Sequence, residues 1–526
     1  MRALNVLLSI AVSLVMAALA FELGLRAIGK GPVETLLQHD ERTGWSKRPS
    51  ASVERSGPEF DVRIETNQLG LVDDSMPTPT KPAGTFRVLV LGDSFTQGFT
   101  VSRDDLYVDL LERRWRAEGR PMDVVNAGTE AWSTDQEVAW FLSQGERFQP
   151  DFVLLAAYEN DLYWNGQARY ITRGAAKPLF RAEGSLEIAH CADVGPLPWT
   201  ERFATTRLLN GLVSPQRVPD EHLFQPEGAS RPILREFAPL LNTKPAFLDR
   251  SIEGTSGALI AFRRECERIG AQPLFLAIPS HAAVDPAHAE RFADEALGGL
   301  DQHLWAPDAP PEFLLRLAQA SGIRGFDPRA ALRAAQRERA QYFDVDWHLN
   351  PAGNRTLAAF LHDELDRSGL LPAACAPQRD VPADLAPAPR GLDWGFVGLL
   401  YGALLAVLST LYCLTYRDAP RSRVPLQVGG LLALVFAIFL GARALLGVLP
   451  PAAAGWVLPA LVLALLGVVA WKLGRRVGTI LELLRCFALR GHWYLMPLLV
   501  VLLTIGSLLV VAASSPLIAP FIYTLF

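Results

Sequence analysis

The position of Ser94 in the sequence suits a nucleophile. This serine belongs to Gly92-Asp93-Ser94, which directly follows an almost entirely apolar run at residues 87–91. This run predicts a strand buried on both faces, so Ser94 would lie at the carboxyl end of the strand and at the start of a helix. Backbone N–H groups and the helix dipole at such a junction can stabilise an oxyanion. The alternative is that Asp93 and Ser94 only cap the helix.

Three further groups of polar residues could complete a catalytic site. Gly128 ends an Asn-Ala-Gly group, and a glycine lets its backbone N–H approach a ligand closely. Asn160, in a Glu-Asn-Asp group, offers an amide N–H donor. His348 follows two aspartates at short range, which could hold one tautomer of a general base. The plainer alternatives are a turn glycine at Gly128, a cap at Asn160 and a surface-loop histidine at His348.

The elements between these groups alternate between strand and helix. Apolar runs predict strands at residues 87–91, 122–125, 151–157, 273–278 and 323–326. Helical spacing of apolar residues predicts helices at residues 104–118, 135–148, 256–269, 312–321 and 351–368. This alternation predicts an α/β domain with a parallel sheet covered on both faces, with the polar groups at the carboxyl ends of its strands. Residues 165–250 are irregular and predict an insertion that shapes the substrate cleft.

The order Gly-Asp-Ser, Asn-Ala-Gly, Glu-Asn-Asp, Asp-x-His resembles that of the SGNH (GDSL-like) hydrolase superfamily, over about residues 86–370. The resemblance implies a flavodoxin-like, doubly wound parallel sheet and ester hydrolysis by a serine nucleophile. It implies that Ser94 is the nucleophile, that His348 is the base and that Asp346 is the acid that orients the base. The oxyanion hole that it implies consists of the N–H groups of Ser94 and Gly128 and the side chain of Asn160.

Two positions depart from the usual pattern of that superfamily. The family commonly has aspartate three residues before the histidine, where this chain has Val345. Asp346 matches the Asp-x-His variant of related membrane-associated and polysaccharide O-acetylation proteins, and Asp344 is a second candidate. Tyr158 replaces the glycine that usually opens the third group, which predicts a narrower cleft. The other supporting candidates are Asp93 and Asp161.

The composition changes along the 526 residues of the chain. The net charge of -5 and the absence of a dense basic patch argue against a nucleic-acid partner. Residues 4–21 form an uncharged apolar run, which predicts a signal anchor or a cleavable signal peptide. Apolar residues resume at 23–25, which favours a retained anchor. Four later runs are long enough to span a bilayer as α-helices, at residues 394–416, 426–449, 452–473 and 493–513.

Basic residues in the short loops predict how these segments are oriented. The loops at 417–423 and 472–490 are rich in arginine, whereas the loop around 450–451 has no charge. The positive-inside rule places both basic loops in the cytoplasm and the catalytic domain in the periplasm of a bacterial inner-membrane protein. The expected organisation is an anchor at 1–29, a β-containing extension and linker at 30–84, a hydrolase-like domain at 85–375, a Pro/Ala-rich linker at 376–392 and a membrane domain with four helices and a tail at 393–526.

The C-terminal span and tail also resemble a known group. They are similar to small uncharacterised membrane proteins found in saxitoxin-type biosynthetic clusters, which suggests a fusion of two units that could otherwise be partners. No cofactor is expected, and no metal is expected because His281 and His288 lack the spacing of ligands. One disulfide could form among the three exported cysteines, which are Cys191, Cys266 and Cys375.

The leading hypothesis is a membrane-anchored serine esterase that acts at the periplasmic face through an acyl-enzyme. Its expected substrates are acylated carbohydrates, lipids or small-molecule esters, with O-acetyl esters foremost. One alternative is an O-acyltransferase that modifies envelope polysaccharide or glycolipid with the help of a membrane acyltransferase partner. Another is an inactive scaffold of an export or biosynthesis complex. The presence of all four polar groups favours an enzyme.

Overall fold

The computed structural model describes residues 36–73, 81–171, 175–193 and 218–379, together with short pieces within 18–22, 203–206 and 381–433. The chain forms two compact units, residues 1–20 with 387–518 and residues 21–386 with 519–526. Among the described residues, no helix combines the length and the apolar character needed to cross a bilayer. The predicted spans are those at 4–21, 394–416, 426–449, 452–473 and 493–513, and most of their residues lie outside the described part.

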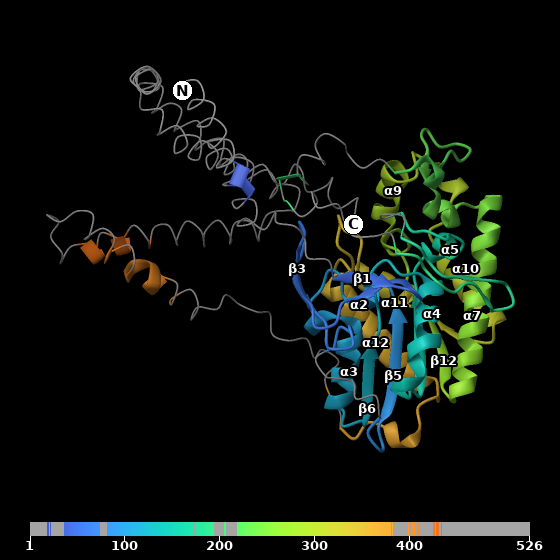
Figure 1. Ribbon diagram of the computed structural model, residues 1–526, viewed down its shortest axis with the longest axis horizontal. Helices are drawn as coiled ribbons and strands as arrows, with labels where there is room; N and C mark the ends of the chain where they lie inside the picture. The colour runs from blue at the N-terminus through green and yellow to red at the C-terminus, as the bar shows by residue number, and fades with distance from the viewer. Residues whose placement is uncertain are drawn as a thin grey trace, which may run out of the picture. The chain divides into compact units, whose positions relative to one another are not determined.

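A five-stranded parallel sheet forms the centre of the second unit (Figure 1). The strands, in chain order, are β5 (Phe86–Gly92), β6 (Met122–Asn126), β7 (Phe152–Ala157), β12 (Gln272–Ala277) and β13 (Arg324–Phe326). Their order across the sheet is β13-β12-β7-β5-β6. The first strand along the chain is therefore next to the second on one side and the third on the other, which is the order of flavodoxin-like doubly wound sheets. The predicted α/β class with a parallel sheet is confirmed.

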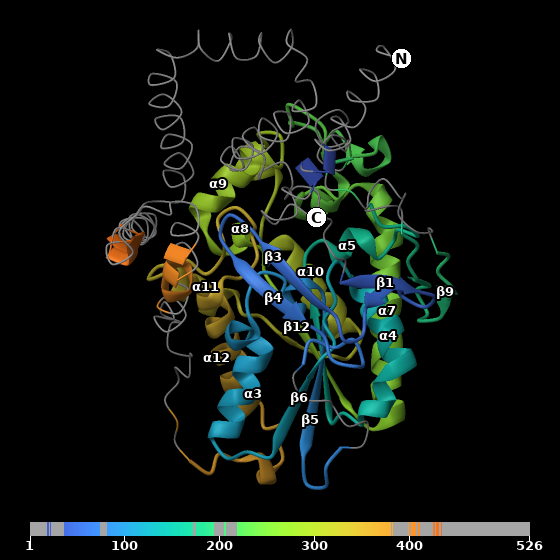
Figure 2. The same ribbon diagram turned by 60° about the vertical axis from the view of Figure 1, so that its left-hand side comes forward.

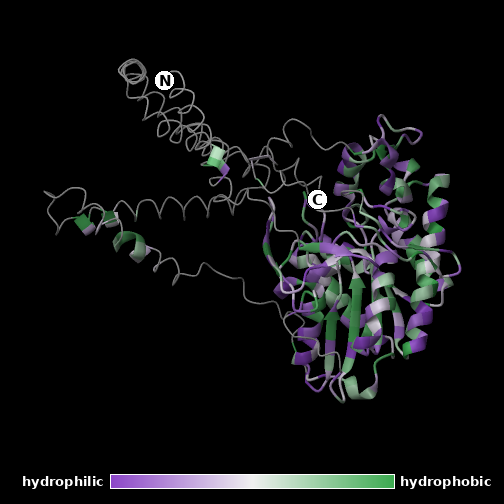
Figure 3. Cartoon of the chain, viewed as in Figure 1, coloured by the Kyte–Doolittle hydropathy of each residue, from purple (hydrophilic) through white to green (hydrophobic). Residues whose placement is uncertain are grey.

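Helices cover both faces of this sheet because its strands are apolar on both sides (Figure 3). On β5, Val88 and Val90 belong to one core cluster, and Leu89 and Leu91 belong to the other. The first cluster includes side chains of α3 (Tyr107–Ala117), α11 (Arg329–Gln336) and α12 (Pro351–Arg367). The second includes side chains of α4 (Thr134–Gln144), α7 (Asp249–Ile269) and α10 (Ala309–Ala320).

Helix α7 is longer than its sequence pattern predicts. It begins at Asp249, whereas the periodicity predicts a start at residue 256. The first turns contain Gly254, a residue that disfavours helix when it is considered alone. A Cβ at this glycine would lie 2.4 Å from the carbonyl oxygen of Asn165. The glycine therefore permits close helix packing, which the local sequence does not reveal.

Two hairpins of the N-terminal extension lie at the end of the sheet to which the arrows of β5 and β6 point (Figures 1 and 2). Strands β1 (Leu37–Asp40) and β2 (Gly44–Lys47) form one, and strands β3 (Ser52–Ser56) and β4 (Asp61–Glu65) form the other. All four strands lie within residues 30–84, where the sequence predicts a β-containing extension. The described residues of the insertion form short elements, among them β8 (Leu179–Phe180), β9 (Leu186–Ile188), β10 (Leu223–Phe224) and β11 (Ile233–Leu234).

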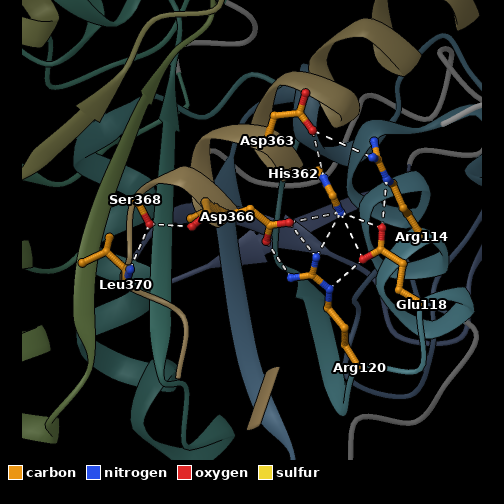
Figure 4. A network of polar contacts seen from close by, with 9 residues as sticks. Arg114, Glu118, Arg120, His362, Asp363, Asp366, Ser368 and Leu370 are labelled. Carbon is orange, nitrogen blue, oxygen red and sulfur yellow. Dashed lines mark hydrogen bonds and ion pairs between the residues drawn. The ribbon is translucent and has the colours of Figure 1, made fainter. Parts of the chain in front are cut away.

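A network of charged side chains joins α3 to α12 near the amino end of β6 (Figure 4). Arg120 donates to both carboxylate oxygens of Asp366 at 2.6 Å, and Nε2 of His362 lies 2.9 Å from Oε1 of Glu118. Arg120, Glu118 and His362 are buried. Paired geometry of this kind offsets the desolvation of buried charges. The network therefore fixes the helix that follows the Ser94 turn against the helix that follows the His348 loop.

The three cysteines in the described residues are all buried and free. The disulfide that the sequence allowed among Cys191, Cys266 and Cys375 is thus not formed. The Cys191 thiol donates to the carbonyl oxygen of Arg42 at 3.7 Å, and Cys266 packs in a core cluster.

Candidate active site

Ser94 is the first residue of α2 (Ser94–Gln97), the short helix that follows β5. Asp93 caps this helix, since its carboxylate accepts a hydrogen bond from the Phe95 N–H at 2.9 Å. The helix has only four residues, so its dipole adds little at Ser94. The backbone N–H of Ser94 donates to no described residue, and its side chain lies in a half-buried position.

The Ser94 hydroxyl and the His348 ring are in contact although they are far apart in sequence. Ser94 Oγ lies 2.7 Å from His348 Nε2, and His348 Nδ1 lies 2.6 Å from Asp346 Oδ1. With the proton assigned to Nδ1, the imidazole donates to the carboxylate and its Nε2 can accept from the serine. The competing candidate, Asp344, binds Arg291 instead. The three side chains thus form a continuous series of hydrogen-bond contacts, in the order that a nucleophile, a base and an orienting acid would need.

The loop that carries His348 is held closed at its base. Tyr342 and Leu349 form an isolated antiparallel bridge, and the Phe343 N–H donates to the carbonyl oxygen of His348 at 2.9 Å. Inside the loop, Trp347 has a φ of 69°, in the left-handed region that bulky residues rarely adopt. This conformation costs about 1–3 kcal/mol and persists only where the surroundings enforce it. It turns the chain between the acid and the base so that both side chains meet.

Two aromatic rings pack against the His348 imidazole. The Phe95 ring centroid is 4.4 Å away and the Phe99 centroid is 5.4 Å away. Tyr158, the residue in place of the expected glycine, lies 4.7 Å from the Phe95 ring. These contacts hold the imidazole ring in place beside Ser94. The sequence offers no signal for this role, because the phenylalanine side chains of Phe95 and Phe99 have no polar or titratable group.

Asn160 lies just beyond the carboxyl end of β7, and its side-chain amide is available for hydrogen bonding. The amide makes no hydrogen bond to any described residue, and its Oδ1 is buried without a partner. The backbone carbonyl, in contrast, accepts from the Tyr163 N–H at 2.9 Å and the Trp164 N–H at 3.1 Å. The turn is therefore fixed by its backbone, while the amide has donors that a ligand could use.

The backbone of Gly128 is used in a different way from the one expected. Its N–H donates to Asn126 Oδ1 at 3.0 Å, and its carbonyl oxygen accepts from the buried Lys47. A Cβ at this position would lie 2.6 Å from the backbone nitrogen of Gln97. Glycine is thus required here because two loops approach closely. In this structure the Gly128 N–H is bound within the protein, so the expected oxyanion donor is not free.

The supporting aspartates belong to the framework of the site and not to its reacting atoms. Burial raises the pKa of Asp93 to about 6, although the hydrogen bond from the Phe95 N–H opposes the shift. Asp161 is fully buried and accepts from the Thr134 hydroxyl at 2.8 Å. Burial, followed by the nearby charge of Asp93, raises the pKa of Asp161 well above its usual range. Neither carboxylate has a hydrogen bond to Ser94 or His348.

His281 and His288, the histidines whose spacing does not suit a metal ion, are stacked on each other. The ring centroids of His281 and His288 lie 3.8 Å apart with an interplanar angle of 12°. Burial is the main cause that lowers the pKa of each to about 4. In the described part of the chain, no group of three or more His, Cys, Asp or Glu residues is arranged to hold a metal ion. The pair packs instead against Tyr342 and Trp347, in and beside the His348 loop.

The fold has several similar solved structures. An acetyl xylan esterase, AlAXEase, is 12% identical, with 54% of this chain and 100% of that chain covered and a TM-score of 0.28. TesA is 15% identical, with 54% and 99% covered and a TM-score of 0.29. An acetyl xylan esterase from Geobacillus stearothermophilus is 14% identical, with 54% and 96% covered and a TM-score of 0.30. Values this low carry no conclusion about activity, so the case for catalysis rests on the geometry of the site.

The comparisons by sequence concern the other end of the chain. Residues 477–526 match a family of unknown function (DUF5989). These residues lie outside the described part of the structure, and the match assigns them no activity. No curated protein matches the chain.

Proposed function

We propose that this protein is a serine esterase of the SGNH type with Ser94 as its nucleophile. The observation that carries the proposal is the continuous contact from Ser94 Oγ to His348 Nε2 at 2.7 Å and from His348 Nδ1 to Asp346 Oδ1 at 2.6 Å. This arrangement lets a neutral imidazole accept the serine proton while a carboxylate stabilises the imidazolium that forms.

The reaction follows from these contacts in two stages. His348 Nε2 takes the proton of Ser94, and Ser94 Oγ forms a bond to the carbonyl carbon of the ester. The tetrahedral adduct collapses, the alcohol leaves with the proton from His348, and the acyl group stays on Ser94. His348 then takes a proton from water, whose oxygen attacks the acyl carbon and releases the acid as Ser94 regains its proton.

The negative charge on the adduct needs donors beside Ser94. The Ser94 N–H and the Asn160 amide are the two expected donors that no described residue occupies. Gly128 could join them only if its N–H left Asn126 Oδ1. Each donor of this kind contributes about 10²- to 10³-fold in kcat. We assign the oxyanion to Ser94 and Asn160 first.

The substrate class and the location are further parts of the proposal. The substrates are acyl esters of carbohydrates, lipids or small molecules, and O-acetyl esters are the first class to assay. The apolar runs and the arginine-rich loops of the sequence support an inner-membrane protein whose catalytic domain faces the periplasm. If a sugar hydroxyl replaces water in the second stage, the same acyl-enzyme gives O-acyl transfer, with a membrane partner as acyl donor.

The proposal is tested with the purified full chain and p-nitrophenyl acetate. Wild type is compared with Ser94→Ala and with Ser143→Ala, a control because the Ser143 hydroxyl only bonds the carbonyl oxygen of Trp140 in α4. Ser94→Ala should remove nearly all hydrolysis and labelling by a fluorophosphonate probe, while Ser143→Ala keeps both. Equal rates in wild type and Ser94→Ala, with no labelling of Ser94, would favour an inactive scaffold. Adding sugar acceptors and analysing products separates hydrolysis from transfer.

A further inference from the structure

The carboxylate of Glu59 binds the loop that carries the acid of the site. Glu59 lies in the turn between β3 and β4, in the N-terminal extension. Its Oε1 accepts from the Asp344 N–H at 2.8 Å, and its Oε2 accepts from the Val345 N–H at 2.9 Å and the Asp346 N–H at 3.1 Å. Three consecutive backbone donors thus converge on one side chain. Hydrogen bonds to a charged acceptor are stronger than neutral ones.

The contacts of the Asp344 and Asp346 side chains, with Arg291 and His348, leave the backbone N–H groups of residues 344–346 to Glu59. Val345 is 44% exposed and therefore gives the loop little packing. Asp346 must keep its carboxylate 2.6 Å from His348 Nδ1, and Trp347 beside it has an unfavourable backbone conformation. The bonds from Glu59 fix the backbone at and before Asp346, and that backbone determines where the carboxylate lies.

Other side chains of the same hairpin contact a ring that packs against the imidazole. The Phe60 ring lies 5.8 Å from the Phe343 ring and 6.5 Å from the Phe99 ring, which itself stacks on His348. The Arg55 guanidinium lies 4.2 Å above the Phe99 ring. In Figures 1 and 2 the hairpin lies at the arrowhead end of the sheet, and Ser94 follows the Gly92 end of β5 after a single residue, Asp93.

We propose that Glu59 is a positioning residue of the active site and that the β3–β4 hairpin is part of the catalytic apparatus. Glu59 acts through the backbone of the Asp346 loop and touches no reacting atom. The catalytic consequence rests on the proposed esterase function, whereas the ordering of the loop does not.

Kinetics test the catalytic part. Glu59→Ala should lower kcat for p-nitrophenyl acetate by about 10- to 100-fold with KM within about twofold, because misplacing Asp346 affects the transition state more than binding. The kcat of Glu59→Gln should lie between those of wild type and Glu59→Ala, because the amide oxygen can still accept a hydrogen bond while the NH₂ group cannot. The matched control is Glu54→Ala, which removes an equal charge at an exposed position of the same hairpin. An unchanged kcat in Glu59→Ala would overturn the catalytic role.

Hydrogen exchange tests the loop itself and does not depend on catalysis. In the full-length protein, Glu59→Ala should speed exchange of the amides of residues 344–346 by about tenfold or more, because each loses its acceptor. Glu54→Ala should leave that exchange as in wild type. If Glu59→Ala does not fold, the exchange of the same amides is measured in Glu59→Gln. Unchanged exchange at these amides would overturn the proposal. If wild type and Ser94→Ala were equally inactive but exchange still rose, the esterase function would fail and the positioning of the loop by Glu59 would stand.

Discussion

His348 Nδ1 lies 2.6 Å from Asp346 Oδ1, although a single residue separates the two in sequence. Side chains two residues apart point the same way in extended chain but do not converge on one another. Here the left-handed Trp347, with a φ of 69°, bends the chain between them. Asp344 pairs with Arg291 instead. The local backbone therefore decides which of the two aspartates contacts His348.

This choice predicts opposite results for two similar substitutions. Asp346→Asn should lower kcat for p-nitrophenyl acetate by about 10³- to 10⁴-fold, because the amide no longer stabilises the imidazolium or fixes its tautomer. Asp344→Asn should keep kcat within about twofold, because its exposed ion pair contributes little. Steady-state kinetics of both variants decide the matter. A larger loss in Asp344→Asn than in Asp346→Asn would show that the acid has been wrongly assigned.

Because the Asn160 amide has no hydrogen-bond partner among the described residues, its removal should lower the catalytic rate without lowering stability. Asn160→Ala removes a donor for the oxyanion, so kcat should fall by about 10²-fold or more while KM changes little. The amide makes no hydrogen bond among the described residues, so the melting temperature should stay within a few degrees of wild type. Kinetics and thermal unfolding are measured on the same preparation. Wild-type kcat in this variant would remove Asn160 from the oxyanion hole.

A buried ion pair ties the insertion to α4 and predicts a large effect on stability. Lys177 Nζ lies 2.9 Å from Asp135 Oδ1, and both side chains are fully buried. Lys177→Met leaves the Asp135 carboxylate without its partner and should lower the free energy of unfolding by about 3–5 kcal/mol. Urea unfolding followed by circular dichroism measures the difference.

The control for this pair is the exposed contact between Arg63 and Glu65, whose side chains are 63% and 61% exposed. Arg63→Ala should change the free energy of unfolding by less than about 1 kcal/mol. The double variant Lys177→Met with Asp135→Leu should recover much of the loss, since no uncompensated charge then stays buried. Similar effects of Lys177→Met and Arg63→Ala would contradict this reading of the pair.

Lys47 predicts a stability that rises with pH. Burial lowers the pKa of Lys47 to about 7, against the opposing effect of the Glu130 charge. Below pH 7 the lysine is charged in both the folded and the unfolded protein, so its burial penalty is fully present. Between pH 7 and its ordinary pKa of 10.5, the unfolded chain binds more protons, so the free energy of unfolding rises with pH.

The comparison of wild type with Lys47→Met isolates this effect. From pH 7 to pH 9, the free energy of unfolding of wild type should gain about 2 kcal/mol relative to the variant. Urea titrations at several pH values in this range provide the measurement. A difference between the two proteins that does not change with pH would mean that Lys47 titrates outside the interval.

Much of the fold could be predicted because it depends on local patterns of burial. Residues 88–91 are all apolar and alternate between the two faces of the sheet, which predicts a doubly covered strand, and β5 is such a strand. Helix α7 shows where this reasoning ends. Gly254 disfavours helix by its own propensity, and only the approach of Asn165 explains why glycine is needed there.

Some features of the candidate site could likewise be predicted from the sequence, and others could not. The sequence by itself determined the residue types and their places at strand ends: a serine after β5, an asparagine after β7 and a histidine just before the helix that Pro351 begins. Periodicity and turn chemistry encode these features because they depend on near neighbours.

Only the tertiary structure decided how these residues are used. It joined Ser94 to His348 across the chain, selected Asp346 over Asp344, and committed the Gly128 N–H to Asn126. It also brought Glu59 from the N-terminal extension to the acid's loop. The physical reason is that a hydrogen bond between distant segments depends on which atoms packing brings within about 3 Å, and no local pattern records that.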